Sequence, residues 1–222
     1  MIRITKGAEP QILQDKAVEW TEAILDKLVV GQDPTTTEKG RYRHPDVKAA
    51  LVAETNGKCA YCESKFLHVH HGDVEHMYPK SLDVLQSFSW INLTLACERC
   101  NQNKSDNDPY LEHIIDPYAL NPEEHLTFLG AFVVSRGTVL GECTRELLKL
   151  HRADLNEERA KQLDFIVRSF RQFSDISLPL VTRRTAYQDF VDSETSPRAR
   201  YSAMNKVVID QLSSDLPPDV TT

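Results

Sequence analysis

Residues 59–62 read CAYC, and residues 97–100 read CERC. Each pair can chelate one ion through two thiolates, and two pairs together supply the four ligands that tetrahedral zinc takes. A redox CxxC motif usually occurs singly at the start of a helix, so a second pair argues against thiol exchange. The sequence therefore predicts a structural zinc site formed by Cys59, Cys62, Cys97 and Cys100.

The composition of the 222 residues is that of a soluble globular protein, in which such cysteine pairs bind metal more often than they form disulfides. The chain has no run of about 18 apolar residues, the length that spans a bilayer. Its start, MIRITKGAEP, lacks the apolar region of a secretory signal. We therefore expect a cytoplasmic protein with no membrane partner.

The charge is unevenly distributed. A formal net charge of −7 argues against a protein that coats nucleic acid by itself. Residues 39–104, however, hold nine Lys or Arg and five His against seven Asp or Glu, whereas residues 105–150 are acidic. This distribution predicts a near-neutral to basic patch on an acidic body.

Helical periodicity appears at both ends of the chain. Apolar residues at three- and four-residue spacing predict a helix over residues 12–30, and a short helix is expected over 46–53. Towards the C-terminus, LTFLGAFVV and TVLGE suggest a hairpin around SRG. Thr144 is then expected to cap a helix through Leu150, and Asp154 a longer one. A last helix is expected around residues 201–212.

The 34 residues between the cysteine pairs exceed the 15–20 typical of a zinc ribbon. This insert contains DVEHMYPKS at residues 73–81. Hydrolysis of a phosphodiester needs a base for water and a divalent cation for the developing charge. His76 suits the base, and Glu75 and Asn101 carry oxygen ligands suited to Mg²⁺. A helix beginning near Cys97 would place Asn101 and Lys104 on one face with that cysteine, so zinc would fix Asn101.

The string C-x₂-C … E-H-x-x-P-K-S … W-x-N-L … A-C-x-x-C-N-x-x-K-S-D resembles the HNH nucleases with a ββα-metal core, in the H-N-N variant. Its end, N-x-x-K-S-D, is similar to the HNH domain of the RNA-guided CRISPR nuclease. The resemblance implies that Glu75 and Asn101 hold a catalytic Mg²⁺ or Mn²⁺ and that His76 is the general base. It also implies that Asn92 tethers the loop and orients the base.

A wider resemblance rests on K-G-x-E-P at residues 6–10 and T-x₂-L-L-x-L-x-R-x₂-L-x₃-R at residues 144–159. Both motifs are similar to the PtuB-type subunits of Septu and of some retron antiphage systems. That resemblance implies a PtuA-type ATPase subunit as partner. In some systems it also implies a retron reverse transcriptase and its DNA product.

Several assignments stay open on the sequence alone. Asp73 either helps to bind metal or simply precedes a strand. Charge alone makes four residues candidates for phosphate contacts, namely Lys104, Lys80, Arg99 and Arg43. For the His68, His70 and His71 cluster, an exposed hairpin is favoured over a metal site.

The sequence thus predicts an α+β protein in three regions. Residues 1–50 form an N-terminal helical segment, residues 51–116 a ββα-metal HNH domain with its Cys₄ zinc site, and residues 117–222 a mainly helical region that docks the partner. Residues from about 213 are expected to be disordered. DNA is the expected substrate, with RNA such as tRNA as the alternative. A non-catalytic zinc module that binds nucleic acid or protein is the competing function.

Overall fold

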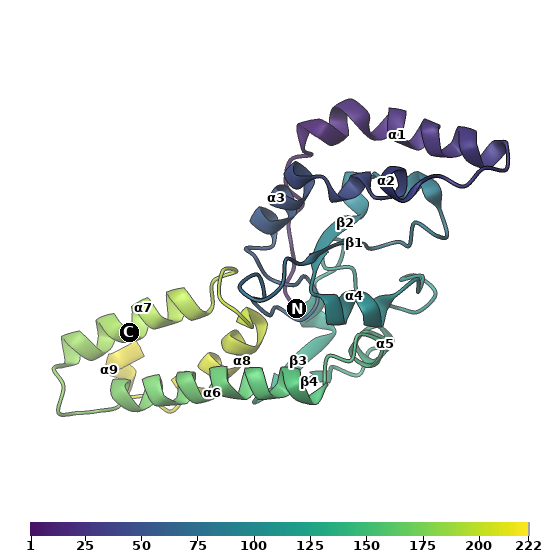
Figure 1. Ribbon diagram of the computed structural model, residues 1–222. Helices are drawn as coiled ribbons and strands as arrows, with labels where there is room; N and C mark the ends of the chain where they lie inside the picture. The colour runs from purple at the N-terminus through teal and green to yellow at the C-terminus, as the bar shows by residue number, and fades with distance from the viewer. Residues whose placement is uncertain (222) are drawn as a thin grey trace. The chain divides into compact units, whose positions relative to one another are not determined.

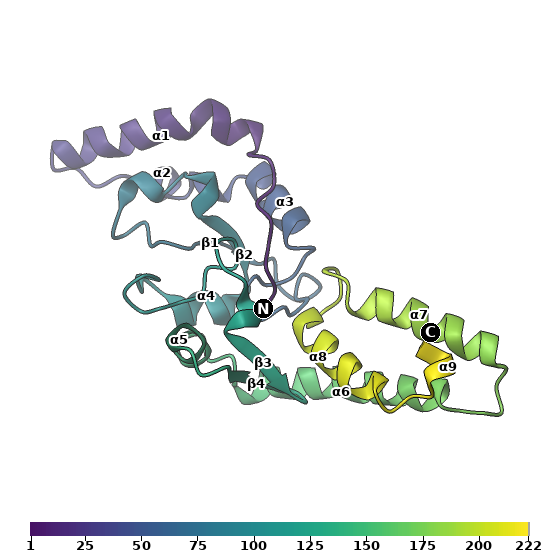
Figure 2. The ribbon, with the colours of Figure 1, turned by 180° about the vertical axis from the view of Figure 1, so that it is seen from behind.

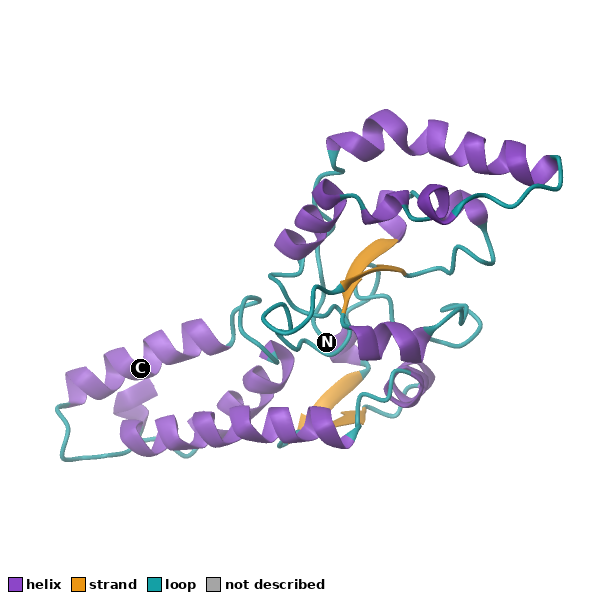
Figure 3. Cartoon of the chain, viewed as in Figure 1, coloured by secondary structure: helices purple, strands orange, loops and turns teal. Residues whose placement is uncertain are grey.

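The computed structural model describes residues 1–221 of the chain. The chain divides into two compact units (Figures 1 and 2). One unit is Arg3–Leu120, and the other joins Met1–Ile2 to the residues from Asn121 onwards. The first unit therefore contains both the N-terminal helical segment and the region with the cysteine pairs, which the sequence suggested as separate regions. Small strands among many helices confirm the expected α+β class (Figure 3).

The first unit is built around a small ββα arrangement. Its elements are α1 (Gln11–Val29), α2 (Thr36–Lys39), η1 (Arg41–Arg43), α3 (Pro45–Glu54), β1 (Asp73–His76), η2 (Val84–Gln86), η3 (Trp90–Asn92), β2 (Leu93–Ala96) and α4 (Glu98–Lys104). Strands β1 and β2 pair antiparallel, with Asp73 opposite Ala96 and His76 opposite Leu93. Helix α4 follows β2 directly and contacts β1. This order is the ββα arrangement that the resemblance to HNH nucleases implied.

Helix α1 buries most of the apolar stripe that its sequence periodicity selects, although Leu28, at the end of that stripe, is 47 % exposed. Leu13, Trp20 and Ile24 face inward at helical spacing. The Trp20 ring meets the ring of Phe88 edge-on, with centroids 5.4 Å apart. Because Phe88 lies between β1 and β2 in the chain, this contact fixes α1 against the segment that joins the two strands.

The K-G-x-E-P segment packs against the start of β2. The ammonium of Lys6 donates to the carbonyl of Leu93 at 2.5 Å and pairs with the carboxylate of Glu54 at 3.0 Å. It also lies 3.8 Å from the centre of the Trp90 ring. The hydroxyl of Tyr118 donates to the same Glu54 carboxylate at 2.5 Å. This motif is therefore a structural part of the unit that contains the ββα hairpin.

The second unit is mainly helical. Its elements are η4 (Pro122–Glu124), β3 (Leu126–Leu129), β4 (Phe132–Ser135), α5 (Val139–Leu147), α6 (Ala153–Phe173), α7 (Leu180–Glu194), α8 (Ser202–Ser213) and α9 (Pro218–Thr221). Strands β3 and β4 pair antiparallel. Two aromatic residues of α6, Phe170 and Phe173, each meet two aromatic residues of α7, Tyr187 and Phe190. All four ring pairs are edge-on, with centroids 5.4–6.2 Å apart. These aromatic contacts hold α6 and α7 together.

Three local expectations for this unit are wrong, and one of them is Asp154 as a cap, because Asp154 lies inside the first turn of α6 and the residue at the N-cap is Arg152. The hairpin is formed by β3 and β4 over residues 126–135, because Gly130 adopts a positive φ of 58° and turns the chain there rather than at SRG. TVLGE instead begins α5, whose cap is Thr138: its hydroxyl accepts from the backbone N–H of Gly141 at 3.1 Å. Thr144, the expected cap, is buried inside that helix.

The expected disordered tail is also wrong for the described residues. Residues 218–221 form α9, and the side chain of Val220 is fully buried. The guanidinium of Arg184, on α7, donates to the carbonyl of Asp219 at 2.7 Å. Thr222 lies outside the described residues. Within residues 1–221, none of the helices combines the length and apolarity that crossing a bilayer requires.

Candidate HNH active site

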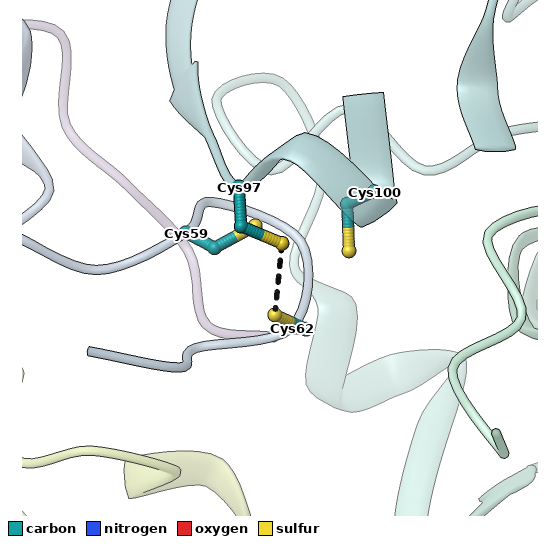
Figure 4. A group of neighbouring side chains, drawn as sticks. All are labelled: Cys59, Cys62, Cys97 and Cys100. Atoms are coloured by element: carbon teal, nitrogen blue, oxygen red, sulfur yellow. Dashed lines mark hydrogen bonds between the residues drawn. The ribbon is translucent and has the colours of Figure 1, made fainter. Parts of the chain in front are cut away.

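The four paired cysteines converge on one point (Figure 4). Cys59 and Cys62 come from the turn after α3, and Cys97 and Cys100 from the start of α4. Their sulfur atoms all lie within 4.8 Å of one another, and those of Cys62 and Cys97 are 3.8 Å apart. Four sulfurs around zinc at about 2.3 Å would be separated by ~3.8 Å in a tetrahedron. The cluster therefore fits a tetrahedral ion such as zinc, which would tie the turn to α4.

The residue immediately before strand β1 occupies a position that requires glycine. Gly72 has a φ of 76°, and a Cβ atom there would lie 2.7 Å from Cε2 of Phe66. The chain then enters β1, where side chains alternate between the two faces. Asp73 and Glu75 therefore share one face of β1, and both reach side chains of α4: Asn101 and Lys104 respectively.

A cavity of about 210 Å³ opens beside β1. Its lining residues are Tyr42, Arg43, Lys48, Gly72, Asp73, Val74, Glu75, His76, Lys80 and Asn101. The structure thus brings together the expected base, three expected metal-binding residues and two expected phosphate contacts. Two carboxylates and an amide are the hard oxygen donors that Mg²⁺ or Mn²⁺ prefers, so these residues fit such an ion.

His76 is buried and held in one tautomer. Its Nε2 lies 3.0 Å from the carbonyl oxygen of Ser87. Because a carbonyl only accepts, Nε2 carries the proton and Nδ1 is left as the acceptor. Burial lowers the pKa of His76 to about 4, against the opposing effect of the hydrogen bond to Ser87. The imidazole is therefore neutral near pH 7 and able to take up a proton.

Glu75 is buried in an ion pair with Lys104. The ammonium lies 3.0 Å from Oε1 of Glu75, and the Lys104 side chain is 0 % exposed. Burial raises the pKa of Glu75 to about 7, although the neighbouring ammonium of Lys104 opposes this rise. A fully buried ammonium has no surface to offer a phosphate, so the structure places Lys104 among the supports of Glu75.

Asp73 orients the amide of Asn101. The amide nitrogen of Asn101 donates to Oδ2 of Asp73 at 2.8 Å. Because a carboxylate only accepts, this bond fixes which end of the amide faces Asp73. The amide oxygen then faces away from Asp73. Asn101 directly follows Cys100, so the cysteine cluster also fixes the backbone from which this amide projects.

Asn92 makes the contacts expected of a residue that tethers a loop. Its Oδ1 accepts from the backbone N–H of Tyr78 at 2.7 Å, and its Nδ2 donates to the carbonyls of Tyr78 and Gln86 at 2.9 and 3.1 Å. These bonds tie together two parts of the segment that joins β1 to η3. Asn92 itself lies outside the cavity lining.

Other residues singled out from the sequence lie away from the cavity. Arg99 is exposed on α4. His68, His70 and His71 lie in the turn before β1 rather than on a hairpin, and Nδ1 of His70 accepts from the backbone N–H of Gly72 at 2.9 Å.

Sequence reasoning missed Gly72 and Val74, which flank Asp73, and two cavity residues from a different part of the chain, Tyr42 and Lys48. The latter two belong to a segment that reads as a loop and the start of a helix. Only the positive charge of this segment could have indicated that it lines the site, because its residues belong to none of the motifs recognised around β1.

A model of the HNH endonuclease family matches residues 59–107. Residues 59–107 are an HNH domain. The match begins at the first cysteine of the cluster and includes β1, β2 and α4. It therefore includes both the cysteine cluster and the residues His76, Glu75 and Asn101.

The relatives of the chain include two Septu proteins PtuB. The protein from Bacillus mycoides (strain KBAB4) is 26% identical over 271 residues, an alignment covering 97% of this chain and 90% of that protein. The protein from Bacillus thuringiensis is 32% identical over 111 residues, covering 50% of this chain and 43% of that protein. Hexokinase-1 of Spinacia oleracea is 31% identical over 160 residues, but only 28% of that protein is covered. The HNH and PtuB-type resemblances predicted from the sequence are both confirmed.

Proposed function

We propose that this HNH-domain protein is a metal-dependent endonuclease that hydrolyses phosphodiester bonds of DNA. The observation that carries the proposal is the convergence of a neutral, tautomerically fixed His76 with Asp73, Glu75 and Asn101 around one cavity. The similarity to PtuB supports a role as the nuclease effector of an antiphage defence complex.

In this proposal His76 is the general base. Its Nδ1 takes a proton from the attacking water, and the Ser87 carbonyl accepts a hydrogen bond from Nε2–H throughout, which stabilises the imidazolium as it forms. Glu75 and Asn101 would hold Mg²⁺ or Mn²⁺, which when bound stabilises negative charge on the phosphate and the leaving oxygen. Arg43 and Lys80 add positive charge on the cavity lining for the phosphate.

We propose zinc as the ion of the cysteine cluster. Zinc bound by Cys97 and Cys100 would hold the first turn of α4, from which Asn101 projects. This arrangement gives the cavity a rigid wall without a large apolar core, since metal binding contributes folding energy in small domains.

The proposed partner is a PtuA-type ATPase subunit, by analogy with PtuB proteins. A net charge of −7 is consistent with recruitment to nucleic acid through such a partner. In a retron-associated system, the reverse transcriptase and its DNA product would join the same complex. Co-purification tests this part: an ATPase encoded beside this chain should be recovered with it, and a chain recovered alone contradicts it.

The catalytic part is tested with His76→Ala and, as a matched control, His68→Ala, which alters an exposed histidine of the same unit. DNA and RNA substrates are incubated with Mg²⁺ or Mn²⁺ and the ATPase subunit. We expect His76→Ala to lose cleavage while its zinc content and melting temperature match those of His68→Ala.

Unchanged cleavage by His76→Ala would refute the assigned base. Cleavage of RNA but not of DNA would show that RNA, the alternative substrate, is the substrate of the enzyme. A wild-type complex that binds nucleic acid but cleaves none, at every metal concentration tested, would favour the non-catalytic zinc module.

A further inference from the structure

Positive charge is concentrated in the segment that ends α2 and begins α3. Residues 39–48 contain four Lys or Arg, namely Lys39, Arg41, Arg43 and Lys48, against one carboxylate, Asp46. The whole chain has a net charge of −7, so this segment departs sharply from the average. The preceding carboxylate, Glu38, is occupied by the capping of α2 and by an ion pair with Lys27.

A buried tyrosine anchors this segment to the candidate base. Tyr42 is 3 % exposed, and its ring meets the His76 ring edge-on with centroids 4.5 Å apart. The charged groups of Arg43 and Lys80 each lie 5.0 Å from the centre of the Tyr42 ring. Because the tyrosine is fixed, the arginine on either side of it in the chain is held at a defined place beside the active-site cavity.

One of these arginines also lines a second hollow. An open groove of about 400 Å³ is lined by Trp20, Thr36, Thr37, Gly40, Arg41, Arg43 and His44. Arg43 lines both this groove and the cavity that contains His76. The guanidinium of Arg41 lies 5.7 Å from the centre of the Trp20 ring, a position that supports its long side chain along the groove wall.

We infer that Arg41 and Arg43 form a track for the phosphate backbone of the strand adjoining the cleaved bond. A guanidinium binds phosphate through two parallel N–H donors, and a groove with positive walls attracts the polyanion. The strand runs from the His76 cavity past Arg43 into the groove at Arg41. This inference rests on the proposed nuclease function and specifies where its substrate lies.

Binding measurements separate this track from catalysis. Arg41→Gln/Arg43→Gln is compared with Arg168→Gln/Arg171→Gln, which removes two exposed arginines from α6 and changes net charge equally. Fluorescence anisotropy with labelled DNA and RNA oligonucleotides is recorded over a range of salt concentrations, without added divalent cation. We expect the track variant to bind about tenfold more weakly at low salt, with its salt slope reduced by about 2.

Arg41→Lys/Arg43→Lys keeps both charges and should retain most of the salt slope, which guards against a folding defect as the cause. Equal weakening in the α6 variant, or unchanged binding in the track variant, overturns the inference. A wild-type chain that binds no nucleic acid, with the ATPase subunit present as well as without it, overturns both the track and the proposed function. Selective weakening in the track variant supports the track even if the wild-type chain never cleaves, so the two failures are distinguishable.

Discussion

Replacing Asp73 by alanine should weaken binding of the catalytic cation without removing a direct ligand. The carboxylate of Asp73 accepts from Nδ2 of Asn101 at 2.8 Å and so directs the amide oxygen away from itself. A hydrogen bond to a charged partner contributes about 1.5–3 kcal/mol. Each 1.4 kcal/mol corresponds to about tenfold in affinity. Losing this orientation should therefore cost ~10- to 100-fold in Mn²⁺ affinity, the range found for groups that position metal ligands.

The variant Asp73→Ala/Asn101→Asp tests the cause of that loss. A carboxylate at position 101 offers oxygen from either end, so it needs no orienting partner. The double variant also has the same net charge as the unsubstituted protein. We expect its Mn²⁺ affinity to lie within about threefold of the unsubstituted value. Titration of zinc-loaded protein followed by electron paramagnetic resonance of free Mn²⁺ measures all three affinities.

Two results would refute this reasoning. If the double variant binds Mn²⁺ as weakly as Asp73→Ala, then Asp73 acts as a ligand in its own right. If Asp73→Ala binds Mn²⁺ normally, then the hydrogen bond to Asn101 has no bearing on the cation. Zinc content and melting temperature, recorded for each variant, show whether the HNH domain has stayed folded.

Three further predictions concern the supports of the site. Because burial raises the pKa of Glu75 to about 7, protons should compete with Mn²⁺ below that pH. Titrations should show the affinity of the protein for Mn²⁺ falling by up to about tenfold per pH unit below pH 7 and staying constant above it. The Glu75→Gln variant should show a weaker dependence on pH. Gly72→Ala should destabilise the chain by about 1–3 kcal/mol in denaturant unfolding, since Phe66 and a φ of 76° both oppose a Cβ atom; an unchanged midpoint would contradict this. Lys6→Met leaves a buried carboxylate without its cation and should cost about 3 kcal/mol by the same measurement, a loss that neutralising the carboxylate should partly restore.

The cysteine cluster and the candidate active site were predictable because their residues carry strong local constraints. A CxxC pair has few structural uses, and two pairs specify the chemistry of the cluster before any fold is known. Asp73 and Glu75 were expected on one face of a strand, because side chains two residues apart point to the same face. Helix α1 was likewise predictable to within a residue, because its apolar stripe is long.

The remaining features depend on contacts between distant parts of the chain. Lys104 looked like a phosphate contact because the sequence records its charge but not its burial against Glu75. The role of Tyr42 depends on an edge-on contact with His76, which lies far along the chain. Helix α7 was missed because its apolar residues follow no clear stripe, and its position is set largely by aromatic contacts with α6.

The contacts of Lys6 affect whether the HNH domain can be cut out of the chain as a separate fragment. The matched stretch, residues 59–107, holds the cysteine cluster and the candidate base His76. It omits Lys6, Glu54 and Tyr118, which brace the start of β2, and Tyr42, which packs on His76. A fragment cut at the boundaries of the match would expose these surfaces to water. We therefore expect that the smallest transplantable module is the whole of residues 3–120, and that the matched stretch grafted alone into another protein would keep the cysteine cluster but lose the packing around His76.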